Sequence, residues 1–388
     1  MAVGGVVDNG HMLTAVAVEG YRSLRSLVIP LAPLTIVTGP NGSGKSSLYR
    51  SLRLLAAASR DGAISALARE GGLPSTRWAG PENGGGTQGT VRKGPVALKL
   101  GFASDDLSYA IDFGLPVTTT PSFALDPEIK TESVWSGPIL RPGTLLTERR
   151  GPTVRVRDSD GWRRHELRLA VWSSVLSEVG DAAAAPEVLA LRDTLRSWRF
   201  YDHVRTDADA PARQSHIGTR TPVLDADGAD LAAALVTIRE LGIASELDDA
   251  IDRAFPGSRL EIDISEGRFS LGLRQPGLLR PLAAAELSDG TLRYLLWVAA
   301  LLTPRPAPLV VLNEPETSLH PALLEPLGEL IAAASTRSQL LVVSHSAPLI
   351  DAMRDASPLV HELEKYLGET RLVGQGLLDG PPWSWPAR

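Results

Sequence analysis

Cysteine is absent from the 388-residue chain. Its absence excludes disulfides, thiolate metal sites, iron–sulfur clusters and a cysteine nucleophile, and nothing in the composition argues for an oxidising compartment. The length predicts two or three compact units, each large enough to bury a core. We therefore expect the chain to fold without covalent cross-links.

Long apolar runs are also missing. The longest extends over Leu295–Leu302, far short of the roughly 20 residues that a transmembrane helix needs. No cationic segment precedes a long apolar stretch near the N-terminus, so a secretory signal is not expected. We therefore expect a cytoplasmic protein without a membrane partner.

Lysine is scarce, with five residues against 34 arginines, and acidic residues outnumber basic ones by 45 to 39. The net charge of -6 gives no overall case for wrapping nucleic acid. The arginine-rich composition, with much alanine, glycine and proline, is typical of a GC-rich bacterial genome. Eight arginines and four acidic residues lie between residues 141 and 168. This segment is either a surface for a phosphate backbone or a solvated hairpin face, and we favour the second.

Hydrophobic spacing divides the chain into three parts. Strand patterns at 13–18 and 34–38 precede a helix pattern at 46–58, and short alternating runs between 96 and 157 predict an antiparallel sheet. Helix patterns then dominate as far as residue 255. From residue 291 to 353, helices and strands alternate, which is typical of a parallel sheet covered on its faces.

Residues 39–46 read Gly-Pro-Asn-Gly-Ser-Gly-Lys-Ser and match the phosphate-binding loop G-x-x-x-x-G-K-[ST]. The context fits, because an apolar strand enters the loop and a helix leaves it; a glycine-rich turn with an incidental lysine would not need either. Lys45 is expected to reach the β- and γ-phosphates of ATP, and Ser46 to bind Mg²⁺. The residues expected to bind the nucleotide here are Gly39, Pro40, Asn41, Gly42, Ser43, Gly44, Lys45, Ser46 and Ser47.

A second chemical signal is the apolar run Leu309–Leu312, which ends on Asn313 and Glu314. A buried parallel strand delivers such residues to the carboxyl edge of its sheet, where ligands bind in open α/β folds. Glu314 is the candidate general base or water-positioning residue. The alternative, a capping glutamate after a core strand, becomes less attractive because a phosphate loop is present.

Two further segments complete a pattern. Ser288-Asp289-Gly290 precedes a strong helix pattern, and the apolar run 341–343 leads through Ser344 to His345. In this order, and together with the phosphate loop and the 309–314 segment, they resemble the ABC, SMC and RecF branch of P-loop ATPases over residues 13–60 and 282–353. The segment 313–321, Asn-Glu-Pro-Glu-Thr-Ser-Leu-His-Pro, is similar to bacterial AAA-type ATPases related to the OLD proteins.

The resemblance implies an α/β fold, an ABC-type P-loop NTPase head with a mixed sheet, an antiparallel β subdomain and an inserted helical element. The implied parts are 13–170 with the phosphate loop and antiparallel sheet, 171–256 as the insertion, and 257–388 with the signature, Walker B and switch histidine. It implies ATP and Mg²⁺ as ligands and an ATP-dependent homodimer. Ser288 and Gly290 would bind the γ-phosphate held by the opposite protomer, and His345 would sense it as a catalytic residue.

The chain departs from the family patterns in two ways. Walker B normally presents aspartate before the catalytic glutamate, but here the residue is Asn313, which would hold Mg²⁺ through water without a negative charge. We therefore expect slow hydrolysis. OLD nucleases also carry a Toprim domain after the ATPase, and 43 residues after His345 are too few for one, so nuclease chemistry is not expected. Gln88 is the candidate for the Mg²⁺-sensing glutamine.

Three functions stay open at this stage. The favoured one is a dimerising, ATP-hydrolysing switch in DNA maintenance or phage defence, with DNA and an effector protein considered as partners. The second is the ATPase subunit of a transporter, although the long insertion before the signature is unlike that class. The third is an ATP-bound scaffold that does not hydrolyse, which Asn313 makes conceivable.

Overall fold

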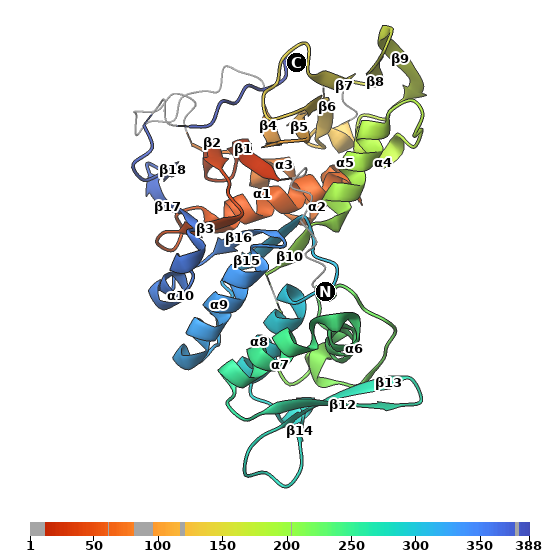
Figure 1. Cartoon of the computed structure of the whole chain (residues 1–388). Helices are drawn as coiled ribbons and strands as arrows, with labels where there is room; N and C mark the ends of the chain where they lie inside the picture. Colours follow the sequence, from red (N-terminus) through yellow and green to blue (C-terminus); the bar gives the residue numbers. More distant parts are fainter. Residues whose placement is uncertain (1–11, 61, 81–95, 117–120, 203, 377–379) are drawn as a thin grey trace. The chain divides into compact units, whose positions relative to one another are not determined.

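The computed structural model describes residues 12–60, 62–80, 96–116, 121–202, 204–376 and 380–388 (Figure 1). These residues form two compact units. The first contains the residues up to Ala32, those from Val37 to Trp198, and those from His361 onward; the second contains Pro33–Ile36 and Arg199–Val360. The segment 171–256, expected as one helical insertion, is divided between the units after Trp198.

An eight-stranded antiparallel sheet forms the main layer of the first unit, in the order β2-β1-β4-β5-β6-β7-β8-β9 (Figure 1). Two-residue turns join β1 to β2, β4 to β5, β7 to β8 and β8 to β9, and the last of these places Asp158 opposite Gly161. The expected antiparallel subdomain is confirmed, with β2, β6 and β9 as strands that the pattern did not indicate. The strands are β1 (Leu13–Tyr21), β2 (Leu24–Pro30), β4 (Leu98–Ser104), β5 (Leu107–Gly114), β6 (Glu128–Ser136), β7 (Leu145–Arg150), β8 (Thr153–Asp158) and β9 (Gly161–Arg168).

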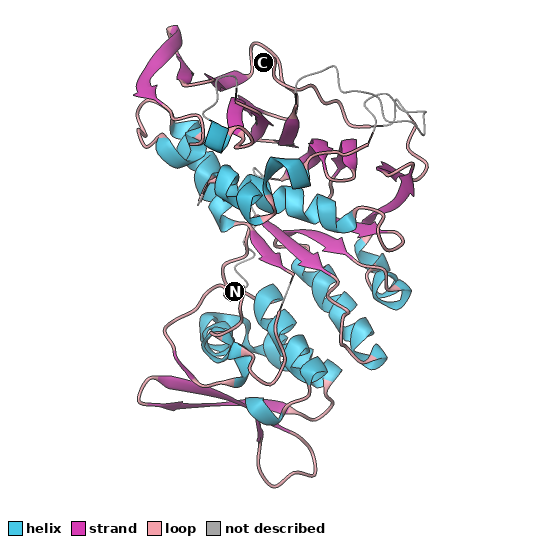
Figure 2. Cartoon of the chain, turned by 180° about the vertical axis from the view of Figure 1, so that it is seen from behind, coloured by secondary structure: helices cyan, strands magenta, loops and turns pink. Residues whose placement is uncertain are grey.

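Helices cover one face of this sheet, as the reverse view in Figure 2 also shows. Helix α1 buries Leu48, Leu52 and Leu55, whose spacing places them on one side of the helix. Trp198, which follows α5, packs on Phe102 of β4 with ring centroids 5.3 Å apart. The helices are α1 (Lys45–Ala58), α2 (Ala63–Arg69), α3 (Gly72–Thr76), α4 (Val175–Glu178) and α5 (Pro186–Ser197).

Parallel strands β10, β15 and β16 form the centre of the second unit, with Val310 opposite both Arg199 and Leu340. The apolar strands β15 and β16 are buried, as expected for a parallel sheet covered by helices. The predicted alternation of strands and helices is thus confirmed. The elements are β10 (Arg199–Tyr201), α8 (Asp289–Leu301), β15 (Leu309–Asn313), α9 (Leu324–Ala334), β16 (Gln339–Val343) and α10 (Ala347–Ala352).

The rest of the second unit combines two helices with a small antiparallel sheet. The first of these helices begins at Leu231, and a π-helical turn, Arg239–Ile243, follows it. A hairpin in this sheet places Leu260 opposite Leu273. The elements are β11 (His216–Ile217), α6 (Leu231–Ile238), α7 (Ala244–Ala254), β12 (Arg259–Ser265), β13 (Arg268–Arg274) and β14 (Leu282–Ala283).

Strand β3 (Leu34–Thr38) leads into the phosphate loop, and its residues fall into both units. Its beginning neighbours β16 in the second unit, where the N–H of Leu340 donates to the carbonyl of Pro33 at 2.8 Å. In the order of the sheet, the next strand after β3 is β17 (Leu359–Tyr366), which pairs antiparallel with β18 (Glu369–Leu372). The expected mixed sheet is confirmed. Among the described residues, no helix has the length and apolar composition needed to cross a membrane.

Candidate nucleotide-binding site

The loop between β3 and α1 has a backbone that glycine alone accommodates. Gly39, Gly42 and Gly44 have φ values of 138°, 80° and 111°, a region that side chains disfavour. A Cβ atom on Gly39 would lie 2.2 Å from the carbonyl oxygen of Leu363, and one on Gly44 would lie 2.1 Å from Oγ1 of Thr370. The loop can therefore turn its N–H groups toward an anion without obstruction.

Polar groups of this loop fit a phosphate ligand. Nζ of Lys45, a 5% exposed residue, donates to the carbonyls of Gly39 at 2.7 Å and Pro40 at 3.1 Å. The hydroxyl of Ser43 is buried without a hydrogen-bond partner among the described residues. Helix α1 begins without a side-chain cap or an acidic residue in its first turn, so its positive end is uncompensated. Ser46, at the same end, is exposed.

A distant strand holds the back of the loop. The hydroxyl of Thr370 on β18 donates to the carbonyl of Ser43 at 2.7 Å and lies 2.8 Å from the hydroxyl of Ser23. The N–H of Thr370 also donates to the carbonyl of Ser23 at 2.9 Å. No motif in the sequence marked Ser23 or Thr370, because they are separated by 347 positions along the chain.

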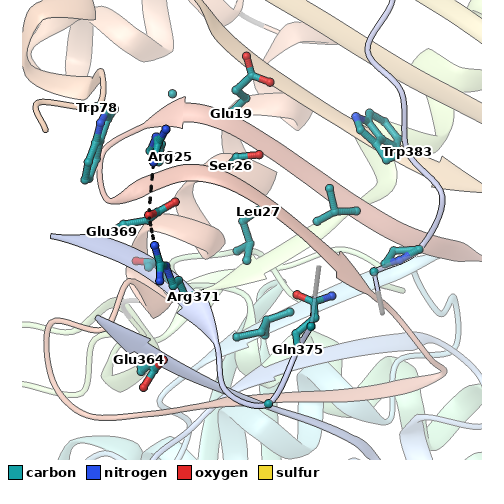
Figure 3. Close-up of a pocket in the computed structure, with 18 of the residues that line it drawn as sticks. Glu19, Arg25, Ser26, Leu27, Trp78, Glu364, Glu369, Arg371, Gln375 and Trp383 are labelled. Atoms are coloured by element: carbon teal, nitrogen blue, oxygen red, sulfur yellow. Dashed lines mark hydrogen bonds and ion pairs between the residues drawn. The ribbon is translucent and has the colours of Figure 1, made fainter. Parts of the chain in front are cut away.

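A cleft of about 1080 Å³ lies beside this strand in the first unit and is polar on several sides (Figure 3). Glu369 lies between two arginines there, 3.0 Å from Arg371 and 3.7 Å from Arg25. None of the predicted site residues lines this cleft. It is thus separate from the ligand groups of the phosphate loop.

The predicted Walker B residues follow β15 in the second unit. Glu314 has a left-handed backbone (φ 49°), and its N–H donates to the carbonyl of Val343 at 2.8 Å. The indole N–H of Trp297 on α8 holds the next residue, Pro315, through its carbonyl at 3.0 Å. Among the described residues, Oδ1 of Asn313 is buried without a hydrogen-bond partner. An unsatisfied amide oxygen fits a role as acceptor for a Mg²⁺-bound water.

Glu316 joins the two strand ends that carry the predicted catalytic residues. Its Oε1 accepts from the hydroxyl of Ser344 at 2.7 Å and from the N–H of His345 at 3.1 Å. Nδ1 of His345 lies 3.5 Å from the same oxygen, and the imidazole is 56% exposed. Oε2 of Glu316 is buried and lacks a partner within the described part of the chain. Glu314 and His345 were predicted catalytic residues, whereas no motif in the sequence indicated this contact of Glu316.

The predicted signature forms the start of α8. Ser288 is the N-cap, and its hydroxyl accepts from the N–H of Thr291 at 3.1 Å. A Cβ on Gly290 would lie 3.0 Å from the carbonyl oxygen of Ser318, so the signature adjoins the segment after Walker B. Arg213, which sequence reasoning missed, contacts this region: its guanidinium donates to the carbonyl of Leu287 at 2.7 Å.

The structure groups the predicted residues within each unit. The phosphate-loop residues lie together in the first unit. In the second unit, Asn313 and Glu314 adjoin the end of β16 and its His345, and Ser288 and Gly290 adjoin the segment at Ser318. Gln88 lies outside the described residues.

The arginine-rich segment, 141–168, is internally paired to a large extent. Arg149 is fully buried against Glu132 at 2.7 Å, and Glu148 contacts both Arg150 and Arg155. Burial raises the pKa of Glu148, but the combined effect of the two guanidinium groups is larger and lowers it. The net shift of this pKa is therefore downward. Several of these arginines are thus already neutralised by nearby carboxylates.

A family model described as "AAA domain, putative AbiEii toxin, Type IV TA system" matches residues 34–352. The chain belongs to this family. An OLD nuclease from Thermus scotoductus is 41% identical over 44 residues, which cover 11% of this chain and 8% of that relative. The similarity to that relative therefore concerns a small part of its length.

Two solved structures share the fold. An Smc head bound to the C-winged helix domain of ScpA has a TM-score of 0.51 at 13% identity, covering 94% of this chain and 98% of that one. The Smc head domain with an extended coiled coil, bound to the C-terminal domain of ScpA from Pyrococcus furiosus, has a TM-score of 0.50 at 12% identity, covering 94% and 96%. The expected ABC-type head fold is confirmed, and the chain is an AAA-type P-loop ATPase by family.

Proposed function

We propose that this protein binds ATP with Mg²⁺ and hydrolyses it as a dimerising molecular switch. The observation that carries the proposal is the phosphate loop. Three left-handed glycines, a buried Lys45 whose ammonium donates to carbonyls of its own loop, and an uncapped helix start converge there. Each of these features is suited to a triphosphate.

Each residue in the proposal has a role that its chemistry supports. Lys45 binds the β- and γ-phosphates, and Ser46, with Asn313 acting through water, would hold Mg²⁺. When bound, Mg²⁺ neutralises charge on the phosphate oxygens. Glu314 accepts a proton from the attacking water, and His345 orients the γ-phosphate.

Dimerisation follows from the role proposed for the signature. In the proposal, the Ser288 hydroxyl and the Gly290 N–H at the start of α8 bind the γ-phosphate held by a second copy. Each protomer would then complete the other's site, and hydrolysis would reopen the pair. We place this switch in DNA maintenance or phage defence in the cytoplasm, with an effector protein as its partner. The short match to an OLD nuclease supports this setting, and the Smc heads support the fold of the switch.

A mixing experiment tests the shared sites. Lys45→Ala should abolish nucleotide binding, because the loop loses its only point charge, and calorimetry measures the affinity. Ser288→Arg should preserve ATP binding and stop hydrolysis. A mixture of the two inactive variants forms one intact site per mixed dimer, so part of the turnover should return. A mixture that stays inactive, or a Ser288→Arg protein with normal turnover, contradicts the proposal.

An ATP-bound scaffold that does not hydrolyse is a second candidate, favoured by the amide at Asn313. The two are separated by single-turnover hydrolysis at saturating Mg²⁺. Production of ADP by the parent protein, lost in Glu314→Gln, supports the hydrolysing switch. A parent protein that retains intact ATP supports the scaffold.

A further inference from the structure

Arg213 connects two segments of the second unit that are far apart in sequence. It ends the short 3-10 turn Pro211–Arg213, and its side chain is 7% exposed. On one side, its guanidinium donates to the carbonyl of Thr206 at 2.8 Å and of Asp207 at 3.0 Å. On the other side, it donates to the segment that leads into α8.

The contacts on that second side surround the signature. The guanidinium donates to the carbonyls of Ala284 at 3.1 Å and Leu287 at 2.7 Å, and to Oδ1 of Asp289 at 2.6 Å. Ser288 lies between the last two acceptors and caps α8. One buried guanidinium therefore holds the backbone immediately before the cap and the side chain immediately after it. A planar fork with five donors suits this task, whereas an ammonium group does not.

The contact between Arg213 and Asp289 also has an electrostatic effect at the start of α8. A carboxylate that is 59% exposed stands between Ser288 and Gly290, the two residues proposed to bind the phosphate. A carboxylate in the first turn stabilises a helix, because it faces the positive end of the dipole. The same charge would repel a phosphate that approaches the helix start. The positive charge of Arg213, at 2.6 Å, offsets it.

We propose that Arg213 is a positioning residue for the signature, a role that rests on the proposed function. Arg213 fixes the backbone that presents the Ser288 hydroxyl and the Gly290 N–H, and it neutralises Asp289. The γ-phosphate held by a second copy of the chain then meets a helix start without a net negative charge. The role combines anchoring of the backbone with compensation of charge, and the two parts are separable by mutation.

ATP-dependent dimerisation measures the charge role. In a Glu314→Gln background, Arg213→Ala should weaken the dimer roughly 10-fold to 100-fold, since an uncompensated like charge then faces the phosphate. The added change Asp289→Asn should recover a large part of this loss, because it removes the charge that Arg213 offsets. Arg213→Lys should give an intermediate dimer. Arg205→Ala is the matched control, because Arg205 pairs with the exposed Asp207 and donates to no part of the signature; it should dimerise like the parent.

Amide hydrogen exchange without nucleotide measures the anchoring role. Arg213→Ala should accelerate exchange over residues 284–292, whereas Arg205→Ala should not. Unchanged exchange, an Arg213→Ala dimer as tight as the parent's, or no recovery by Asp289→Asn each overturns the proposal. A Glu314→Gln parent that stays monomeric with ATP overturns the proposed function and the role of Arg213 within it. Faster exchange in Arg213→Ala then shows that the failure lies in the dimer model rather than in the anchoring.

Discussion

The carboxylate of Glu316 accepts a hydrogen bond of 2.7 Å from the hydroxyl of Ser344. The first residue follows β15 and the second follows β16, so the bond ties two neighbouring strand ends of the second unit. The N–H of His345 donates to the same oxygen at 3.1 Å. The N–H of the proposed switch histidine is therefore held by the side chain of the second glutamate after the strand, Glu316.

Glu316→Ala is expected to lower turnover roughly 10-fold while ATP affinity stays near that of the parent, because His345 loses the group that orients its backbone. Steady-state kinetics and calorimetry on the same preparations measure both quantities. Glu316→Gln keeps an acceptor for Ser344 and should recover part of the rate. His345→Ala provides the comparison, with an expected loss of roughly 10-fold to 100-fold in turnover. Equal losses of affinity and turnover in either alanine variant would mark a structural role instead.

A fully buried ion pair in the first unit gives a prediction about stability. Arg149 and Glu132 are 2.7 Å apart with both side chains at 0% exposure, and Arg149 also donates to the carbonyl of Ala170 at 2.8 Å. The hydroxyl of Tyr109 donates to Glu132 at 2.6 Å; burial first, and then the Glu132 charge, raise the pKa of this tyrosine. The network therefore connects β5, β6 and β7 with the segment before α4.

Glu132→Gln should lower the free energy of unfolding by about 3–5 kcal/mol, because it leaves the guanidinium buried without its counterion. Urea unfolding monitored by circular dichroism measures the change. The double variant Glu132→Leu, Arg149→Met should lose less than Glu132→Gln alone, because no charge then stays buried. A Glu132→Gln protein with the parent's unfolding midpoint would show that the pair contributes little.

The site shows which features the sequence can predict. The strand, loop and helix around Lys45 were predictable because the motif is continuous in sequence and its glycines adopt the positive φ angles that the loop requires. Glu316 and Ser344 are separated by 28 positions, and Arg213 and Asp289 by 76, so neither contact has a spacing signal. β18 was missed for a related reason: it is a four-residue strand, and its Thr370 acts through a tertiary contact with the phosphate loop.

The arginine-rich segment yields a prediction about DNA. Replacing Arg155, Arg157, Arg163 and Arg164 by alanine should weaken any binding of duplex DNA and reduce its salt dependence by about one unit of slope per lost phosphate contact. Arg155 is paired with Glu148 and Arg163 with Asp158. We therefore expect the slope of the salt dependence to fall by less than the roughly four units that four phosphate contacts would give. Fluorescence anisotropy across a salt series measures the slope. If the parent protein binds no DNA at low salt, the hypothesis that this segment contacts DNA is excluded.

Asn313 gives the sharpest prediction, because it stands where a Walker B segment normally carries aspartate. Its Oδ1 is buried without a partner among the described residues, which leaves it available to a metal-bound water. Mg²⁺ prefers carboxylate and phosphate oxygens in tight octahedral geometry, and an amide oxygen supplies the hydrogen bond without the charge. The neighbouring Glu316 has a second buried oxygen, Oε2, that also lacks a partner in the described part of the chain.

If weak metal binding limits the rate, Asn313→Asp should lower the Mg²⁺ concentration for half-maximal hydrolysis and raise turnover, whereas Glu314→Gln should nearly stop hydrolysis. A Mg²⁺ titration of phosphate release, at constant free ATP, measures both effects. Asn313→Ala is the control and should shift the midpoint the other way, because it removes the acceptor. If the Mg²⁺ titration of Asn313→Asp is identical to that of the parent, the metal contact belongs to Glu316 instead. In that case, Glu316→Gln should raise the Mg²⁺ concentration for half-maximal hydrolysis. Full turnover in Glu314→Gln would show that the Glu314 carboxylate is not the general base.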